Sequence, residues 1–212
     1  MEIYWLGQSC FKIKSKEITL ITDPYSPEIG LKMPKLEADI VTISHNHFDH
    51  NYLKAISGEP FVVDGPGEYE FKGVNINGIL SYHDEKKGEE RGYNTIYLIE
   101  MEGLRICHLG DLGHLLNDKI IDQLDGVDIL MIPVGGFYTI NAQKASAVIN
   151  QINPKIIIPM HYKIDGLSFE LDSVDKFCKE IGVCHKPQEK LSIKKNNLTE
   201  EQEEEVIILQ KK

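Results

Sequence analysis

One segment of the chain, His45-Asn46-His47-Phe48-Asp49-His50, carries four side chains of the kinds that bind metal ions. Neutral imidazoles and carboxylates are the usual ligands of zinc and similar divalent ions. Side chains alternate in direction along an extended loop, so His45 and His47 are expected to point the same way and to bind one ion together. If a helix begins near Phe48, Asp49 and His50 are aimed at a second ion nearby.

Three further ligand-type residues each follow an apolar segment that is typical of a strand. His83 follows the predicted strand 74–82, Asp111 lies just beyond 104–107, and His161 follows 156–158. Ligands placed just past the ends of several strands are expected to meet at one rim of the fold. A single histidine at such a place is weak support for a metal site, but three such residues beside the 45–50 segment predict a centre for two ions.

The elements that must position these residues change in character along the chain. Before Asp111, short β-branched or aromatic runs alternate with Gly, Pro and Asp. These runs predict strands at 3–6, 10–13, 18–22, 40–44, 61–63, 74–80, 93–99 and 104–107. Later segments predict helices over 117–124, 145–152 and 174–181, strands at 129–132 and 156–158, and an edge strand at 206–209. We expect an α/β fold with two packed sheets and helices outside, in a single domain over 1–212.

Composition narrows the classes of partner. The chain has 212 residues and a formal charge of −10, so nucleic-acid backbone is not an expected ligand. Part of that charge lies in the run 200–205, which we expect to be solvated surface. No apolar run approaches the roughly 20 residues that span a bilayer, and no signal peptide is visible. The four scattered cysteines, Cys10, Cys107, Cys178 and Cys184, indicate reduced thiols of a cytoplasmic protein.

The chain resembles the metallo-β-lactamase fold superfamily, in particular small zinc-dependent hydrolases related to L-ascorbate-6-phosphate lactonase. The 45–50 segment carries most of this resemblance. Shorter motifs extend it over nearly the whole chain: Trp5-Leu6-Gly7-Gln8-Ser9-Cys10, Thr22-Asp23-Pro24, Pro66-Gly67-Glu68-Tyr69-Glu70, Gly110-Asp111-Leu112-Gly113, Pro133-Val134-Gly135-Gly136 and Pro159-Met160-His161-Tyr162.

The resemblance implies a four-layer αβ/βα metallo-β-lactamase sandwich with metal ions at one edge. It implies that His45, His47 and His83 bind the first ion. It implies that Asp49, His50 and His161 bind the second, and that Asp111 bridges the two. The expected cofactors are two divalent ions, with zinc first and manganese or iron as alternatives, because these ligands suit several ions.

This arrangement predicts hydrolysis of a small ester, lactone or phosphodiester. Two ions close together hold a bridging hydroxide at neutral pH, and that hydroxide attacks carbonyl and phosphoryl centres alike. Asp49 and Asp111 are the expected catalytic carboxylates. Asp23 is a candidate for fixing an imidazole tautomer. The loop 135–139, with Lys163, is a candidate for the pocket of a small-molecule substrate. His108 and His114 flank Asp111, and packing is the better explanation of both.

Three alternative functions remain open. A nuclease of the same superfamily is disfavoured by the acidic chain and by the lack of a basic nucleic-acid-binding module. A diiron oxidoreductase is disfavoured because its relatives carry Glu where His47 stands and add a flavin domain. A non-catalytic metal-binding protein is disfavoured because all seven ligand positions are filled. The sequence does not indicate an oligomeric state.

Overall fold

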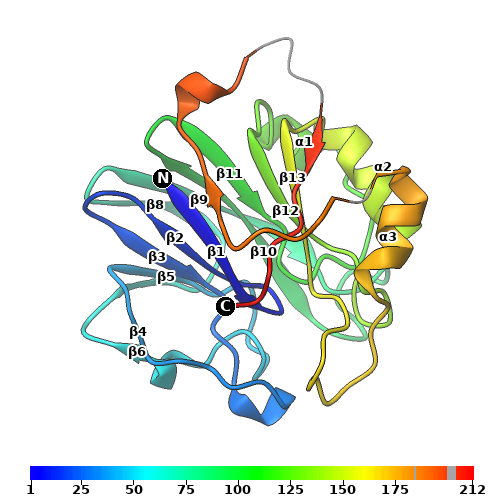
Figure 1. Ribbon diagram of the computed structural model, residues 1–212, viewed down its shortest axis with the longest axis horizontal. Helices are drawn as coiled ribbons and strands as arrows, with labels where there is room; N and C mark the ends of the chain where they lie inside the picture. The colour runs from blue at the N-terminus through cyan, green and yellow to red at the C-terminus, as the bar shows by residue number, and fades with distance from the viewer. Residues whose placement is uncertain (184, 200–203) are drawn as a thin grey trace.

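The computed structural model describes residues 1–183, 185–199 and 204–212, and it shows two β-sheets packed face to face (Figure 1). The expected α/β sandwich is confirmed. Cys184 and most of the acidic run 200–205 lie outside the described residues. Within the described part of the chain, no helix is long and apolar enough to cross a membrane.

The first sheet contains most of the N-terminal strands. Its order is β14-β1-β2-β3-β5-β7. The bounds are β1 (Glu2–Gly7), β2 (Cys10–Lys14), β3 (Thr19–Thr22), β5 (Ile40–Thr42), β7 (Phe61–Val63) and β14 (Leu191–Ser192). Strands β3, β5 and β7 are parallel. A separate two-stranded pair joins β4 (Leu36–Glu37) to β6 (Ile56–Ser57).

The second sheet has the order β15-β13-β12-β11-β10-β9-β8. Its bounds are β8 (Gly67–Phe71), β9 (Val74–Tyr82), β10 (Tyr93–Met101), β11 (Leu104–His108), β12 (Ile129–Pro133), β13 (Ile156–Met160) and β15 (Glu205–Val206). The pairs β9–β10 and β10–β11 are antiparallel, while β11, β12 and β13 are parallel. Strands β9, β11 and β13 therefore run in one direction, and their carboxyl ends share an edge.

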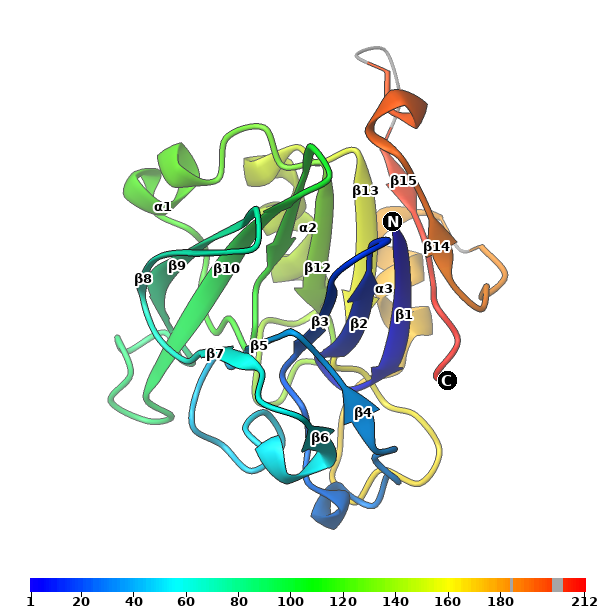
Figure 2. The ribbon, with the colours of Figure 1, turned by 90° about the vertical axis from the view of Figure 1, so that its left-hand side faces the viewer.

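The helices cover the outer side of the second sheet (Figures 1 and 2). They are α1 (Asp118–Gln123), α2 (Ala142–Ile152) and α3 (Val174–Ile181), as the periodicity predicted. Asn117 caps α1 and Asn141 caps α2 by accepting backbone N–H bonds. The outer side of the first sheet is covered more thinly, by loops and the short 3₁₀ helices η1 (Pro27–Ile29) and η2 (Leu53–Ala55).

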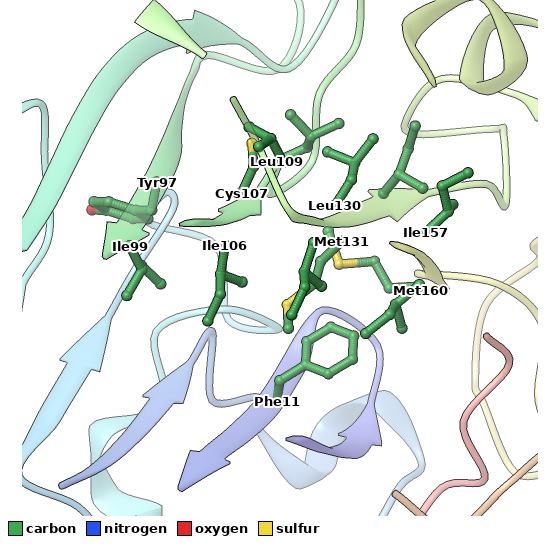
Figure 3. Packing of buried hydrophobic residues seen from close by; sticks show 14 of the residues in the cluster. Phe11, Tyr97, Ile99, Ile106, Cys107, Leu109, Leu130, Met131, Ile157 and Met160 are labelled. Atoms are coloured by element: carbon green, nitrogen blue, oxygen red, sulfur yellow. The ribbon is translucent and has the colours of Figure 1, made fainter. Parts of the chain in front are cut away.

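Apolar side chains between the two sheets form the main core. Phe11 of β2 points toward Met131 and Met160 of the other sheet, and all three are fully buried (Figure 3). Tyr97 of β10 crosses the interface with its hydroxyl, which donates to the Ile43 carbonyl at 2.7 Å. Burial of this many apolar side chains is the main source of stability, and it holds both sheets in a fixed relation at the edge where the ligands lie.

Two strands of the second sheet differ from the prediction. β8 was not predicted, because its alternation is weak and its side chains are mostly exposed or half-buried at a sheet edge. The edge strand expected at 206–209 is shorter, with β15 ending at Val206. The short 3₁₀ helix η3 (Lys195–Asn197) follows β14.

Candidate metal centre

All seven predicted ligand side chains meet at one edge of the sandwich. The segment 45–50 follows β5 of the first sheet. His83, Asp111 and His161 follow β9, β11 and β13 of the second sheet. Two groups result, and the ligand atoms within each lie within 4.8 Å of one another. The groups are His45, His47 and His83, and Asp49, His50, Asp111 and His161.

The segment 45–50 does not begin a helix. It forms one tight turn, in which His50 N–H donates to the His47 carbonyl at 2.9 Å and Asn51 N–H donates to the same oxygen at 3.1 Å. The chain then continues into η2 without regular α-helix. No helix therefore begins near Phe48, but the single turn still directs Asp49 and His50 into the second group.

Asp23 and Ser44 fix the tautomers of two imidazoles. The buried Asp23 carboxylate accepts from His50 Nδ1 at 2.8 Å and from the Ser44 hydroxyl at 2.6 Å. Because the Ser44 hydroxyl donates to Asp23, its oxygen accepts from His45 Nδ1 at 2.9 Å. With both Nδ1 atoms protonated, the Nε2 lone pairs of His45 and His50 face the cluster, as metal-binding histidines require. The prediction that Asp23 fixes an imidazole is supported by this contact.

Asp111 lies between the two groups. Its Oδ2 atom is 3.3 Å from His83 Nε2 and 3.2 Å from both His50 Nε2 and His161 Nε2. The deeply buried His50 Nε2 nevertheless has no hydrogen-bond partner among the described residues. Two nitrogens bound to one tetrahedral zinc ion at about 2.0–2.1 Å lie about 3.3 Å apart. The spacing and the unpartnered nitrogen therefore fit a group of side chains that converge on cations.

The backbone around Asp111 is held by Asn94, which the sequence analysis missed. Asn94 is buried at the start of β10. Its side-chain oxygen accepts from Asp111 N–H at 2.9 Å, and its amide donates to the Leu109 carbonyl at 2.9 Å. Ser44 was missed as well. A polar residue inside or at the end of an otherwise apolar strand was the available signal for both.

His83 and His161 are positioned by close backbone packing. A Cβ atom at Gly113 would overlap the backbone of His83, and one at Gly135 would overlap the carbonyl of His161. His161 itself has a positive φ of 50°, which is uncommon for a residue with a side chain. The Nδ1 atoms of both histidines have no hydrogen-bond partner among the described residues. His83 and His161 are thus positioned by close packing of their backbones, whereas the rings of His45 and His50 are positioned by hydrogen bonds.

Burial and neighbouring charges set the protonation of the cluster. Burial, reinforced by His50, lowers the pKa of His45 to about 3, so this imidazole is neutral and able to bind a cation. Burial acts to raise the pKa of Asp111, but His161 and His50 outweigh it and hold the pKa well below its usual range. Asp111 is therefore an anion across the physiological range.

The remaining candidate residues, His108, His114 and Lys163, make hydrogen bonds to backbone groups. His108 is buried, with Nε2 donating to the Ser9 carbonyl and Nδ1 accepting from Gly110 N–H. His114 accepts from Tyr82 N–H at 3.1 Å and donates to the Leu115 carbonyl at 2.7 Å. Both imidazoles thus bind backbone groups, and neither belongs to the two ligand groups. Lys163 donates to the Phe169 carbonyl at 3.0 Å and does not line the pocket over the cluster.

That pocket has a volume of about 400 Å³. Its floor consists of cluster residues, and its walls include Phe48, Tyr138 and Phe169. From the predicted loop 135–139, only Tyr138 lines it. Arg91 lines it as well, although no feature of the sequence singled this residue out. The pocket is therefore small, partly aromatic and open to solvent above the ligand side chains.

Comparison with known proteins assigns the chain to a family. The model of the β-lactamase superfamily domain matches residues 2–161. A protein from Thermotoga maritima, assigned to the zinc-dependent hydrolases of the metallo-β-lactamase superfamily, has a solved structure with 36% identity, coverage of 99% of both chains and a TM-score of 0.80.

Two archaeal relatives agree with this result. A metal-dependent hydrolase of Thermoplasma volcanium is 29% identical over 80% of this chain and 90% of its own length. A protein of Pyrococcus abyssi is 30% identical over 78% of this chain and 85% of its own length. The chain therefore belongs to the metallo-β-lactamase superfamily, among its metal-dependent hydrolases.

Proposed function

We propose that the chain hydrolyses a small ester, lactone or phosphodiester with two divalent ions, zinc by preference, held by the seven-residue cluster. The observation that carries this proposal is the position of Asp111 Oδ2, within 3.3 Å of imidazoles from both ligand groups. A single carboxylate shared by two groups of imidazoles is an arrangement suited to a pair of cations.

Each ion has its own set of ligands in this proposal. His45, His47 and His83 hold one, Asp49, His50 and His161 hold the other, and Asp111 serves both. When bound, two such ions polarise the bond to be broken and lower the pKa of a shared water. No cysteine of the described residues belongs to either group, and nitrogen and oxygen ligands suit zinc, manganese and iron. The zinc dependence assigned to the Thermotoga maritima relative supports zinc as the first choice.

Asp49 is proposed as the carboxylate that orients the attacking water and takes its proton. Its side chain is about 13% exposed and lines the pocket, whereas the Asp111 side chain is about 2% exposed. Burial acts to raise the pKa of Asp49, and the adjacent His50 outweighs it and lowers the pKa. The carboxylate is therefore ionised and accessible to a water in the pocket.

A small substrate fits the pocket better than a polymer does. The pocket holds about 400 Å³, within the size range of small-molecule sites. Arg91 is the only arginine or lysine among its lining residues, and the whole chain carries a charge of −10. Binding of a nucleic acid rests on many phosphate contacts, which a single cation does not supply. The nuclease remains the alternative that the test below must distinguish.

A substrate panel tests the proposal. Lactones, carboxyl esters, nitrophenyl phosphodiesters and structured RNA are assayed with zinc and with manganese. We expect turnover of at least one small-molecule class, abolished by chelator. Asp49→Asn, prepared in parallel, should lose the same activity and so exclude a contaminating hydrolase. Cleavage of RNA alone, with rates that fall steeply as salt rises, would overturn the proposal in favour of the nuclease.

A further inference from the structure

Arg91 lies at the rim of the pocket, at the end of a loop that begins at a ligand. The loop leaves the cluster after His83 and returns at Gly92, where His83 N–H donates to the Gly92 carbonyl at 3.1 Å. Arg91 therefore stands one residue from a backbone hydrogen bond to a ligand residue. Its position relative to the cluster is set by that bond and by the loop between.

The loop is organised by one carboxylate. Asp84, which is buried, accepts backbone N–H bonds from Lys86, Gly88, Glu90 and Arg91 at 2.8–3.1 Å. Through the bond from Arg91 N–H, Asp84 fixes the backbone of Arg91 itself. A segment held by four bonds to one side chain presents its last residue in a defined place.

The guanidinium of Arg91 keeps most of its hydrogen-bonding capacity. It makes one long hydrogen bond, from Nη2 to the Phe137 carbonyl at 3.4 Å, and lies 6.0 Å from the centroid of the Tyr138 ring. Its nearest carboxylate, Glu90, is 3.6 Å away, and Glu90 pairs more closely with Lys86, at 2.6 Å. An arginine has five N–H donors in a planar fork, so the donors that bind a carboxylate or phosphate in bidentate fashion remain available.

We propose that Arg91 binds an anionic group of the substrate, a carboxylate or a phosphate, and so places the bond to be hydrolysed over the ligand cluster. The proposal rests on the proposed function and names its substrate class. Phe48, Tyr138 and Phe169 contact the apolar part of that substrate. Lys163, a candidate cation from the sequence, donates instead to the Phe169 carbonyl and so supports the aromatic wall.

Paired substrates test this assignment. Esters of one alcohol are compared, one neutral, one with a distal carboxylate and one with a distal phosphate, so that the two sources of anion are distinguished. We expect Arg91→Gln to lower kcat/KM for at least one of the anionic esters by roughly tenfold to a hundredfold, mainly through KM, and to affect the neutral ester much less. Arg91→Lys should recover part of the loss, and raised salt should weaken binding of the anionic ester to the wild type.

The matched control is Arg105→Gln. Arg105 is the other arginine of the chain, and it lines a different hollow together with Glu100. This control changes the net charge by the same amount and should leave every substrate unaffected. An equal loss on neutral and anionic esters in Arg91→Gln, or no loss on any ester, would overturn the assignment.

A binding measurement separates this inference from the proposed function. Phenylphosphonate and benzoate are titrated into the metal-loaded protein, with benzamide as the neutral probe. We expect at least one of the anions to bind the wild type roughly tenfold or more tightly than Arg91→Gln, and benzamide to show no difference. This result supports Arg91 even if no tested ester is cleaved. Equal anion affinity of the two proteins, or no anion binding to the wild type at millimolar concentration, would contradict it.

Discussion

The ligands from the two sheets are held in different ways. In the first sheet, His45 and His50 each have an Nδ1 atom bonded to a buried oxygen, from Ser44 and Asp23 respectively. In the second sheet, His83 and His161 have Nδ1 atoms without such a partner among the described residues. Their backbones instead press against Gly113 and Gly135, where no side chain fits.

This difference predicts how substitutions around each of the two sets of histidines affect the protein. A hydrogen bond sets the tautomer and the orientation of an imidazole, so its loss affects cation binding directly. Close packing of backbone sets only the place of the ring, so its loss acts through the fold. Substitutions around Asp23 should therefore alter metal affinity more than stability, and substitutions at Gly135 should do the reverse.

Asp111 contacts histidines from both sheets, so its replacement should have the largest effect on metal binding and activity. Asp111→Ala removes the carboxylate that faces imidazoles of both groups. We expect binding of both ions to weaken and activity to fall by roughly a thousandfold or more. His83→Ala should mainly weaken the first site, and His161→Ala the second. Elemental analysis and kinetics check this. Two tightly bound ions with full activity in Asp111→Ala would show that the bridging role is wrong.

Gly135→Ala should have the next largest effect, on stability. The added Cβ overlaps the His161 carbonyl, so the backbone must shift. We expect a loss in the free energy of unfolding of about 3 kcal/mol, as for severe overpacking. Gly65→Ala is the control, since a Cβ there meets nothing within 4 Å. Chemical denaturation of the metal-free proteins measures both. Similar stabilities for the two variants would remove the packing argument.

Asp23→Asn tests the hydrogen bond that positions His50. The Asn oxygen still accepts from Ser44 N–H, but its NH₂ group cannot accept from His50 Nδ1. His50 then loses its fixed tautomer. We expect metal affinity at the second site to fall roughly tenfold to a hundredfold while the protein remains folded. Competition with a chromogenic chelator gives the affinity, and unchanged affinity would mean that Asp23 has only a structural role.

His114→Ala should have the smallest effect. It removes the acceptor for Tyr82 N–H, one residue before His83. We expect a loss of about 1 kcal/mol in the free energy of unfolding, with metal content unchanged, because other backbone contacts still hold His83. Thermal denaturation and elemental analysis are sufficient. Loss of an ion in this variant would show that His83 depends on hydrogen bonds as much as His45 does.

The sequence was sufficient to predict which seven side chains converge at one edge and most elements of the sandwich. His45 to His50, His83, Asp111 and His161 were identifiable because few residue types bind metals and each stood just past an apolar strand. The helix α2 was predictable because its apolar residues recur at helical spacing and face the core. In both cases the local sequence pattern reflects the surroundings that the side chains have in the folded protein.

Other features depend on contacts that no local pattern contains. Asn94, for example, binds the Asp111 N–H across 17 positions of the chain. In the sequence, Arg91 cannot be distinguished from a surface cation. It lies at the pocket because the loop between His83 and Gly92, held by Asp84, brings it there. The sequence also left open whether a helix begins near Phe48. None does, because Ser26 N–H donates to the Phe48 carbonyl and holds that oxygen outside a helical pattern.

Metal content of the purified protein tests the central claim most directly. The protein is purified without added metal, reconstituted with zinc, freed of excess ion and analysed for bound metal per chain. The seven-residue cluster predicts a value close to two, with a loss of stability when chelator removes the ions. A value near zero, together with stability that chelator does not change, would contradict the account.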